Sequence, residues 1–284
     1  MGRDTAGAWL GKRFSTAAGI AVALSMMATA AFAETLTIGV TPGSLADSIE
    51  VAATEARKQG VDVKAIEFTD WATPNVALNA GDLDINYFQH QAFLDNAVSE
   101  TGFKLKSVAV GLLPNLGLYS SKYDSFEALP QGARVGVAND PVNQGRGLQL
   151  IERAGLIRLA DGVGARGTLD DIVENGRDLQ FVEIEGPQLV RALEDVDLAQ
   201  GYPAHYVNAG QPDVAGRALL YSGIDDIHFA IRFVAREDNA DDPLIRRFVG
   251  IYQNSDAVKA QIHKSFADNP KLYSLPWTQG ASVN

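Results

Sequence analysis

No cysteine occurs among the 284 residues of this chain. Its absence excludes disulfide bonds, a thiol nucleophile and the acylation of an N-terminal cysteine. The folded protein must therefore be held together by its hydrophobic core, which about 250 residues can supply.

Positive charge is also scarce, with 24 Lys and Arg against 35 Asp and Glu. Without Arg3, Asp4, Lys12 and Arg13, which lie in the first stretch of the chain, 21 basic and 34 acidic residues remain and the net charge is −13. A surface this acidic repels phosphate backbones and anionic lipid head groups, so we expect no nucleic-acid partner. An anionic ligand would need cations concentrated in its site.

Long hydrophobic runs are missing except for residues 15–33, which follow three basic residues and end in Ala31-Phe32-Ala33. This pattern is typical of a secretory signal with a small-x-small cleavage site. The alternative is a membrane anchor, but the run contains Ser, Thr and Gly and stops at the cleavable triplet. We expect residues 1–33 to be removed and the mature chain to begin at Glu34.

Arrangements typical of enzymes and metal sites are absent from the sequence. The four histidines, at positions 90, 205, 228 and 263, show no HExxH spacing, and neither GxSxG nor a phosphate-binding GxxxxGK[ST] occurs. Residues 162–167 fit GxGxxG but follow no clear strand, so we interpret them as a loop. We predict no catalytic residue, metal or cofactor, and a periplasmic enzyme stays the minority alternative.

Strand and helix patterns alternate along the rest of the chain, which is typical of an α/β protein. Ser44 and Asp47 resemble a capping box at the start of a helix that reaches Lys58. Residues 156–178 are expected to form a helix and a loop. The other expected strands are 35–40, 61–68, 84–87, 133–138, 179–184 and 196–200, and the other expected helices are 74–79, 91–99, 143–154, 187–194, 242–252 and 255–266.

The apolar segment 108–119 is too long and too broken to be one ordinary strand, and we interpret part of it as a crossover into a second lobe. A second apolar segment, 227–235, is interpreted as the crossover back to the first lobe. A chain that leaves one lobe, builds another and returns makes a paired hinge with a ligand cleft at the interface. We predict a first lobe of residues 34–116 and 229–284 and a second lobe of residues 117–228.

The segment from Asn139 to Gly147 places free backbone N–H groups at a helix start, with Arg146 about one turn further on. A carboxylate could be held there by the helix dipole and the guanidinium together. The alternative is an ordinary helix start with a solvated arginine.

Aromatic and polar residues gather at the ends of two predicted strands. Tyr87, Phe88 and His90 lie at the end of one strand and Trp71 lies at the end of the preceding one, at positions where α/β folds place ligand groups. The aromatic rings could form walls around an apolar ligand group, or they could be ordinary core residues.

Together these segments resemble the methionine-binding lipoproteins of the NlpA/MetQ family over nearly the whole mature chain. The resemblance implies a type II periplasmic-binding-protein fold, with two α/β lobes joined by a two-strand hinge, and the role of solute receptor for an ABC permease at the inner membrane. It implies a side-chain pocket of Trp71, Phe88 and His90, with Arg146 on the ligand carboxylate and Asn143 nearby. The segments that carry it are TDWATPN (69–75), GDLDINYFQH (81–90), ANDPVNQGR (138–146), DIVEN (171–175) and RED (236–238).

The departures from the family are informative too. Ala33-Glu34 stands where family members carry a lipidated cysteine, so we expect a non-lipidated, monomeric periplasmic protein. The family's His-Ala-Glu after the first strand is Leu45-Ala46-Asp47 here. Two amide positions of the family become Ala204 and Ile231.

Polar ligand groups buried against Ala204 and Ile231 would lose about 1–3 kcal/mol each. Either Tyr202 and His205 replace the amides, or the ligand is not free methionine. We therefore expect methionine or a related compact carboxylate. The alternatives are a short peptide, a sulfur-containing organic acid or an aromatic compound.

Overall fold

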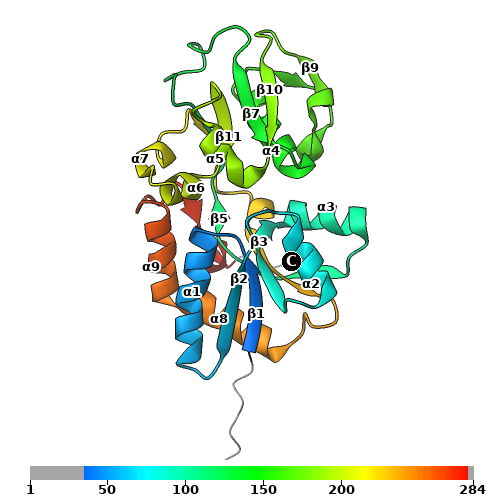
Figure 1. Ribbon diagram of the computed structural model, residues 1–284, viewed down its shortest axis with the longest axis vertical. Coiled ribbons are helices and arrows are strands. Elements are labelled where there is room, and N and C mark those ends of the chain that lie inside the picture. The colour runs from blue at the N-terminus through cyan, green and yellow to red at the C-terminus, as the bar shows by residue number, and fades with distance from the viewer. Residues whose placement is uncertain (1–34, 281–284) are drawn as a thin grey trace, which may run out of the picture. The chain divides into compact units, whose positions relative to one another are not determined.

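The computed structural model describes residues 35–280 and contains two five-stranded sheets (Figure 1). In the first sheet, β2, β1 and β3 are parallel, and β13 lies antiparallel between β3 and β4. The predicted third strand is longer than expected, because it continues through His90. The strands of this sheet are β1 (Thr35–Val40), β2 (Asp62–Glu67), β3 (Ile85–His90), β4 (Leu105–Val110) and β13 (Ile231–Arg236).

Helices cover both faces of the first sheet. On β13, Phe233 packs into the cluster formed with α1, α8 and α9, whereas Val234 packs on the other face against Leu78 of α2 and Leu94 of α3. This alternation follows from the strand period of two residues. The helices are α1 (Ser44–Arg57), α2 (Thr73–Ala80), α3 (Gln91–Thr101), α8 (Pro243–Asn254) and α9 (Asp256–Ser265).

The second sheet has the strand order β10-β7-β11-β6-β12, with β10, β7 and β11 parallel and β6 antiparallel to both neighbours. Its strands are β6 (Gly117–Tyr119), β7 (Arg134–Ala138), β10 (Gln180–Ile184), β11 (Leu198–Gly201) and β12 (Leu220–Tyr221). Its helices are α4 (Pro141–Arg153), α5 (Leu189–Ala192), α6 (Pro203–Asn208) and α7 (Pro212–Ala215).

The stretch 156–178 differs from its prediction. It contains a small antiparallel pair, β8 (Arg158–Leu159) with β9 (Ile172–Glu174), and two 3₁₀ turns, Gly164–Arg166 and Leu169–Asp171, in place of an α-helix. The expected helix at 187–194 is a 3₁₀ turn, Gly186–Gln188, followed by the single turn of α5. Runs this short offer too few apolar positions to define a helical face.

Two connections join the sheets, one from β4 to β6 and one from β12 to β13. The first contains β5 (Leu113–Pro114), which pairs with β14 (Tyr273–Ser274), and the second contains the 3₁₀ turn Ile227–Phe229. A last 3₁₀ turn, Pro276–Gln279, follows β14. The residues at which each lobe begins and ends remain a prediction from the sequence. The predicted signal segment lies outside the described residues.

The start of α1 is not a capping box. Its N-cap is Gly43, at a φ of 92°, and no side chain caps the helix, whereas Ser44 is already helical. The Asp47 carboxylate instead accepts hydrogen bonds from Gln261 and Ser265 of α9. A residue with a side chain at position 43 would overlap the amide of Asn208, so the close approach of α6 requires glycine here.

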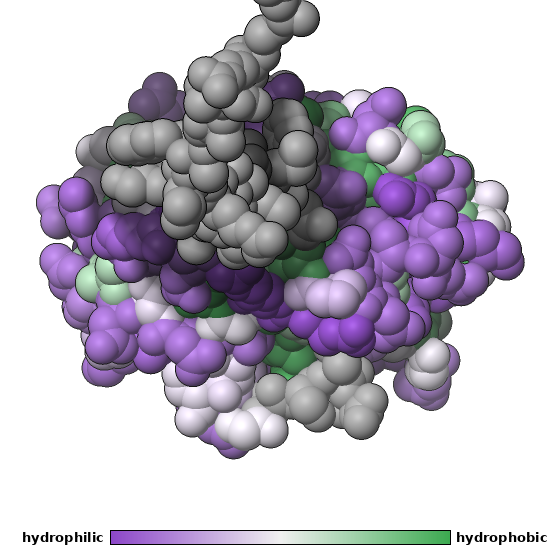
Figure 2. All heavy atoms as spheres, turned by 90° about the horizontal axis from the view of Figure 1, so that it is seen from below, coloured by the Kyte–Doolittle hydropathy of each residue, from purple (hydrophilic) through white to green (hydrophobic). Residues whose placement is uncertain are grey.

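The surface of the described part is largely polar. Among residues 35–280, Val76 and Val173 are the large hydrophobic residues that stand well exposed. On the face in Figure 2, hydrophilic residues predominate where uncertain residues do not cover it. Within this range, no helix combines the length and the apolar character needed to cross a bilayer.

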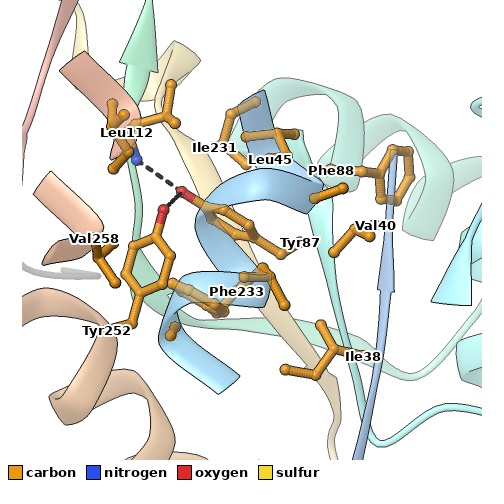
Figure 3. Packing of buried hydrophobic residues seen from close by; sticks show 14 of the residues in the cluster. Ile38, Val40, Leu45, Tyr87, Phe88, Leu112, Ile231, Phe233, Tyr252 and Val258 are labelled. Atoms are coloured by element: carbon orange, nitrogen blue, oxygen red, sulfur yellow. Dashed lines mark hydrogen bonds between the residues drawn. The ribbon is translucent and has the colours of Figure 1, made fainter. Parts of the chain in front are cut away.

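A buried relay of hydroxyl groups ties the first lobe to the crossover that follows β4 (Figure 3). Ser48 Oγ lies 3.1 Å from Tyr252 Oη, and Tyr252 Oη lies 2.9 Å from Tyr87 Oη. The backbone N–H of Leu112 donates to Tyr87 Oη at 3.0 Å. Phe233 stacks on the Tyr87 ring with centroids 4.1 Å apart. Burial raises the pKa of Tyr252 to about 12, so the relay is uncharged at neutral pH.

The relay makes a testable prediction for stability. We expect Tyr87→Phe to lower the free energy of unfolding by about 1–3 kcal/mol, because the buried N–H of Leu112 loses its acceptor. Tyr206→Phe is the matched control: the Tyr206 hydroxyl is buried without a partner among the described residues, so its removal should be neutral or stabilising. Urea unfolding measures both, and equal losses in the two variants would contradict the role of the relay.

Candidate functional site

A cavity lies where the two lobes meet, and its wall contains residues of both. Its volume is about 60 Å³, measured at the positions that a water centre can occupy, which is room for a few water molecules. It therefore suits a small molecule. The wall residues of the first lobe are Thr41, Pro42, Ser44, Leu45, Trp71, Phe88, Gln89, His90, Phe93, Leu112, Pro114 and Ile231, and those of the second lobe are Asn143, Tyr202, Ala204 and His205.

The strands bring these residues together. Thr41 follows the last residue of β1, His90 ends β3, and Tyr202 directly follows β11. Ligand sites of open α/β sheets lie at the carboxyl ends of parallel strands. The cavity is therefore where the topology places a site.

Aromatic rings make up much of the wall and cross from one lobe to the other. The Trp71 ring centroid lies 6.3 Å from that of Tyr202, in an edge-to-face arrangement, and 6.5 Å from that of His205. Phe88 meets Phe93 edge to face at 5.8 Å. A side chain on Gly186 of the second lobe would overlap the Trp71 indole, so glycine permits this close packing.

A polar network begins at the Asp140 carboxylate, which caps α4. It accepts hydrogen bonds from the backbone N–H of Asn143 at 2.9 Å and from its side-chain amide at 3.1 Å. This fixes the amide so that Asn143 Oδ1 faces the cavity. That oxygen accepts a hydrogen bond from the Tyr202 hydroxyl at 2.8 Å and lies 3.3 Å from His90 Nε2. The network thus joins the two lobes across the site.

The two histidines of the wall are neutral at pH 7. Burial, with a further contribution from Arg146, lowers the pKa of His90 to about 3. His90 Nδ1 accepts the backbone N–H of Phe93 at 3.1 Å, so the ring proton is on Nε2, which donates to Asn143 Oδ1. Burial lowers the pKa of His205 to about 4.

Arg146 lies behind Tyr202 and is only 5% exposed. It donates from Nη1 to Tyr202 Oη at 3.2 Å and from Nη2 to Ser222 Oγ at 3.4 Å, and its guanidinium carbon is 4.1 Å from the centroid of the Phe229 ring. Its Nε has no partner, and no acidic side chain within residues 35–280 forms an ion pair with it. A buried cation without a counterion is costly, so the position favours an anion nearby.

Arg146 does not itself contribute to the wall of the cavity. It lines a neighbouring cavity of about 290 Å³, whose wall also contains Arg153, Ser222, Phe229 and two acidic residues, Asp225 and Asp226. The guanidinium therefore reaches the first cavity through the Tyr202 hydroxyl.

The structure places the residues predicted from the sequence in three groups. Tyr87 and Asn139 are away from the cavity, and Arg146 is behind its wall. The Tyr87 hydroxyl points into the core relay, because neighbouring residues of a strand point to opposite faces (Figure 3). Asn139 is exposed, and its backbone N–H donates to Ile184. The predicted residues that line the cavity are Trp71, Phe88, His90, Asn143, Tyr202 and His205.

Several wall residues were not predicted. Phe93 lies one turn into α3, where the His90 cap sets its position, and Ser44 and Leu45 open α1. Ala204 and Ile231, the expected amide positions, both line the cavity. No group of three or more acidic or histidine side chains in the described range could hold a metal ion.

Several known proteins similar to this chain are named D-methionine-binding lipoprotein MetQ. The D-methionine-binding lipoprotein MetQ of Salmonella typhimurium is 39% identical over 228 residues, which cover 78% of this chain and 83% of that protein. The MetQ protein of Escherichia coli K12 is 37% identical with the same coverage of this chain.

Solved structures agree in fold. The crystal structure of the methionine-binding protein MetQ has a TM-score of 0.77 at 37% identity and covers 82% of this chain and 95% of its own. A nutrient-binding protein from Burkholderia cenocepacia bound to methionine has a TM-score of 0.77 at 35% identity, covering 82% and 97%. The fold is therefore the two-lobed type II periplasmic-binding-protein fold. Since the model of the NlpA lipoprotein family matches residues 36–272, this chain belongs to that family.

Proposed function

We propose that this protein is the extracytoplasmic solute-binding component of an ABC importer and that it binds methionine or a related compact molecule with a carboxylate. One observation carries the proposal: a small, largely apolar cavity with walls from both lobes adjoins a buried arginine that forms no ion pair within residues 35–280. The relatives named as D-methionine-binding lipoproteins support the same class of ligand.

The proposed pose follows from the chemistry of the wall. An apolar ligand group packs between the rings of Trp71 and Phe88, and the carboxylate lies against the Tyr202 hydroxyl and Asn143. Arg146 then stabilises the negative charge through Tyr202, or directly after a small shift of that ring. Because both lobes contribute to the wall, binding and release require the lobes to open about the two connections.

A changed ligand is the second candidate. Ala204 and Ile231 make the wall apolar where family members carry amides, which favours a sulfur-containing organic acid or another compact carboxylate. A short peptide or a larger aromatic compound would require a wider cavity than the one described. A periplasmic enzyme on this scaffold would be supported only by turnover of a compound that binds.

We propose further that the chain is exported by cleavage after Ala33 and acts in the periplasm as a non-lipidated monomer that docks on a permease. The relatives named lipoproteins differ from it in this respect. The support is the Ala31-Phe32-Ala33 triplet followed by Glu34 in a chain without cysteine.

Thermal-shift screening tests the class of ligand. L-methionine, D-methionine, dipeptides, short organic acids and aromatic acids are compared, and we expect the largest stabilisation from a compact carboxylate. A ligand at 100 times its Kd should stabilise the protein by about 2.7 kcal/mol. If dipeptides or aromatic acids stabilise most, the proposed ligand class is wrong.

Arg146→Ala tests the proposed anion partner. We expect the affinity for the best compound of the screen to fall by about 2–5 kcal/mol in calorimetry, since a desolvated charge would lose its counterion. Arg191→Ala is the control, because Arg191 is exposed on α5, and it should leave affinity unchanged. An unchanged affinity in Arg146→Ala would remove Arg146 from the site.

The neutral histidines predict the pH dependence of binding. Because the pKa values of His90 and His205 are about 3 and about 4, neither ring gains a proton between pH 8 and about pH 5, and affinity should stay constant over that range. A transition in affinity near pH 6.5 that His205→Asn abolishes would contradict the assignment of a buried neutral ring.

A further inference from the structure

The amide oxygens at the cavity wall are already used as hydrogen-bond acceptors. Asn143 Oδ1 accepts from Tyr202 and His90, as described above. Gln89 Oε1 accepts from Asn75 Nδ2 at 2.9 Å, and Gln89 Nε2 donates to Asn75 Oδ1 at 2.6 Å and to Asn86 Oδ1 at 3.0 Å. Both lone pairs of Asn143 Oδ1 are therefore engaged, whereas Gln89 Oε1 keeps one free lone pair.

Among the residues that the structure describes, no Asp or Glu side chain lines the cavity. The Asp140 carboxylate lies outside the wall and is held by the backbone and side chain of Asn143. The side-chain acceptors that remain in the wall include Gln89 Oε1 and the side chains of His205, Thr41 and Ser44, and none of them is negatively charged. An ammonium group carries three donors and a full charge, so its burial here is poorly compensated.

Positive charge and free donors dominate the surroundings of the same cavity. Besides burial, the positive charges of Arg146 and Arg232 lower the pKa of His90. The start of α1, a helix of 14 residues without a side-chain cap, contributes Ser44 and Leu45 to the wall. Unpaired N–H groups at a helix start attract negative charge. Like the Arg146 guanidinium, which forms no ion pair within residues 35–280, these features favour a negatively charged ligand.

From this asymmetry we infer that the site prefers a compact carboxylate without an ammonium group over the matching α-amino acid. The inference rests on the proposed function and narrows its ligand class. The apolar wall of Trp71, Phe88, Ala204 and Ile231 takes an alkyl or thioether body, and the donors around Tyr202 take the carboxylate. The α-carbon then carries hydrogen, a hydroxyl or a keto oxygen.

Calorimetry with three compounds tests the preference on the intact mature protein. These are L-methionine, its des-amino analogue methylthiobutanoate, and its decarboxylated analogue methylthiopropylamine. We expect methylthiobutanoate to bind at least about tenfold more tightly than methionine, because no negatively charged side chain of the wall compensates the ammonium, and the amine not to bind. D-methionine is measured alongside to exclude an effect of stereochemistry.

The outcomes distinguish the inferred preference for a carboxylate without an ammonium group from the proposed receptor function. If L-methionine or D-methionine binds as tightly as methylthiobutanoate, or more tightly, the inference is wrong. The proposed receptor function is then unaffected. Failure of all three compounds to bind overturns the proposed ligand class and the inference with it.

Two variants test the physical cause. Ala204→Ser and Ile231→Asn each add an acceptor to the wall, and either should shift the ratio of affinities toward methionine by about tenfold. Circular dichroism and thermal unfolding establish that each variant is folded, and Ala204→Ser, the smaller change, serves if Ile231→Asn does not fold. An unchanged ratio in a folded variant overturns the account based on missing acceptors.

Discussion

The side-chain oxygen of Asn143 is the point at which the two lobes are joined through the site. It accepts from Tyr202 of the second lobe and faces the Nε2 proton of His90 of the first. His90 is fixed by the backbone N–H of Phe93, and Asn143 is fixed by the Asp140 carboxylate. An opening of the lobes must break the His90 contact, so the chemistry of the wall and the closure of the protein are coupled.

The positive charge of Arg146 makes the surroundings of Asn143 favourable for an anionic ligand. The buried guanidinium of Arg146 is connected to Asn143 through the Tyr202 hydroxyl, and it has no counterion within the described part of the chain. A ligand carboxylate near Tyr202 would supply the missing charge and would stabilise the closed arrangement at the same time. The cost of burying an unpaired cation thus becomes a preference for an anionic ligand.

Much of the fold could be predicted from the sequence, because alternating apolar runs and glycine or proline breaks determine strands and crossovers. The start of α1 could not, since a positive φ at Gly43 lets the helix begin without a side-chain cap and frees Asp47 to bond to α9. Residues 156–178 were predicted wrongly because short strands and 3₁₀ turns lack a periodic pattern.

The candidate site was predicted in composition better than in geometry. Trp71, Phe88 and His90 line the cavity, but the side on which each residue of β3 lies is set by the pleat, which sends Tyr87 into the core. The position of Arg146 behind Tyr202 depends on how α4 packs against the second connection, which no local pattern encodes. Ala204 and Ile231 were singled out only by comparison with the family resemblance, which has amides at these positions. Both residues line the cavity, so the replacement of the amides makes the wall more apolar.

Native mass spectrometry of the protein, purified from cells without refolding, tests the central claim most directly. A receptor that closes on a compact anion should carry a bound mass of a small carboxylic acid, which is lost on mild activation and is absent from Arg146→Ala. A protein that carries no small molecule under any growth condition, or one whose bound compound has no acidic group, would contradict the account.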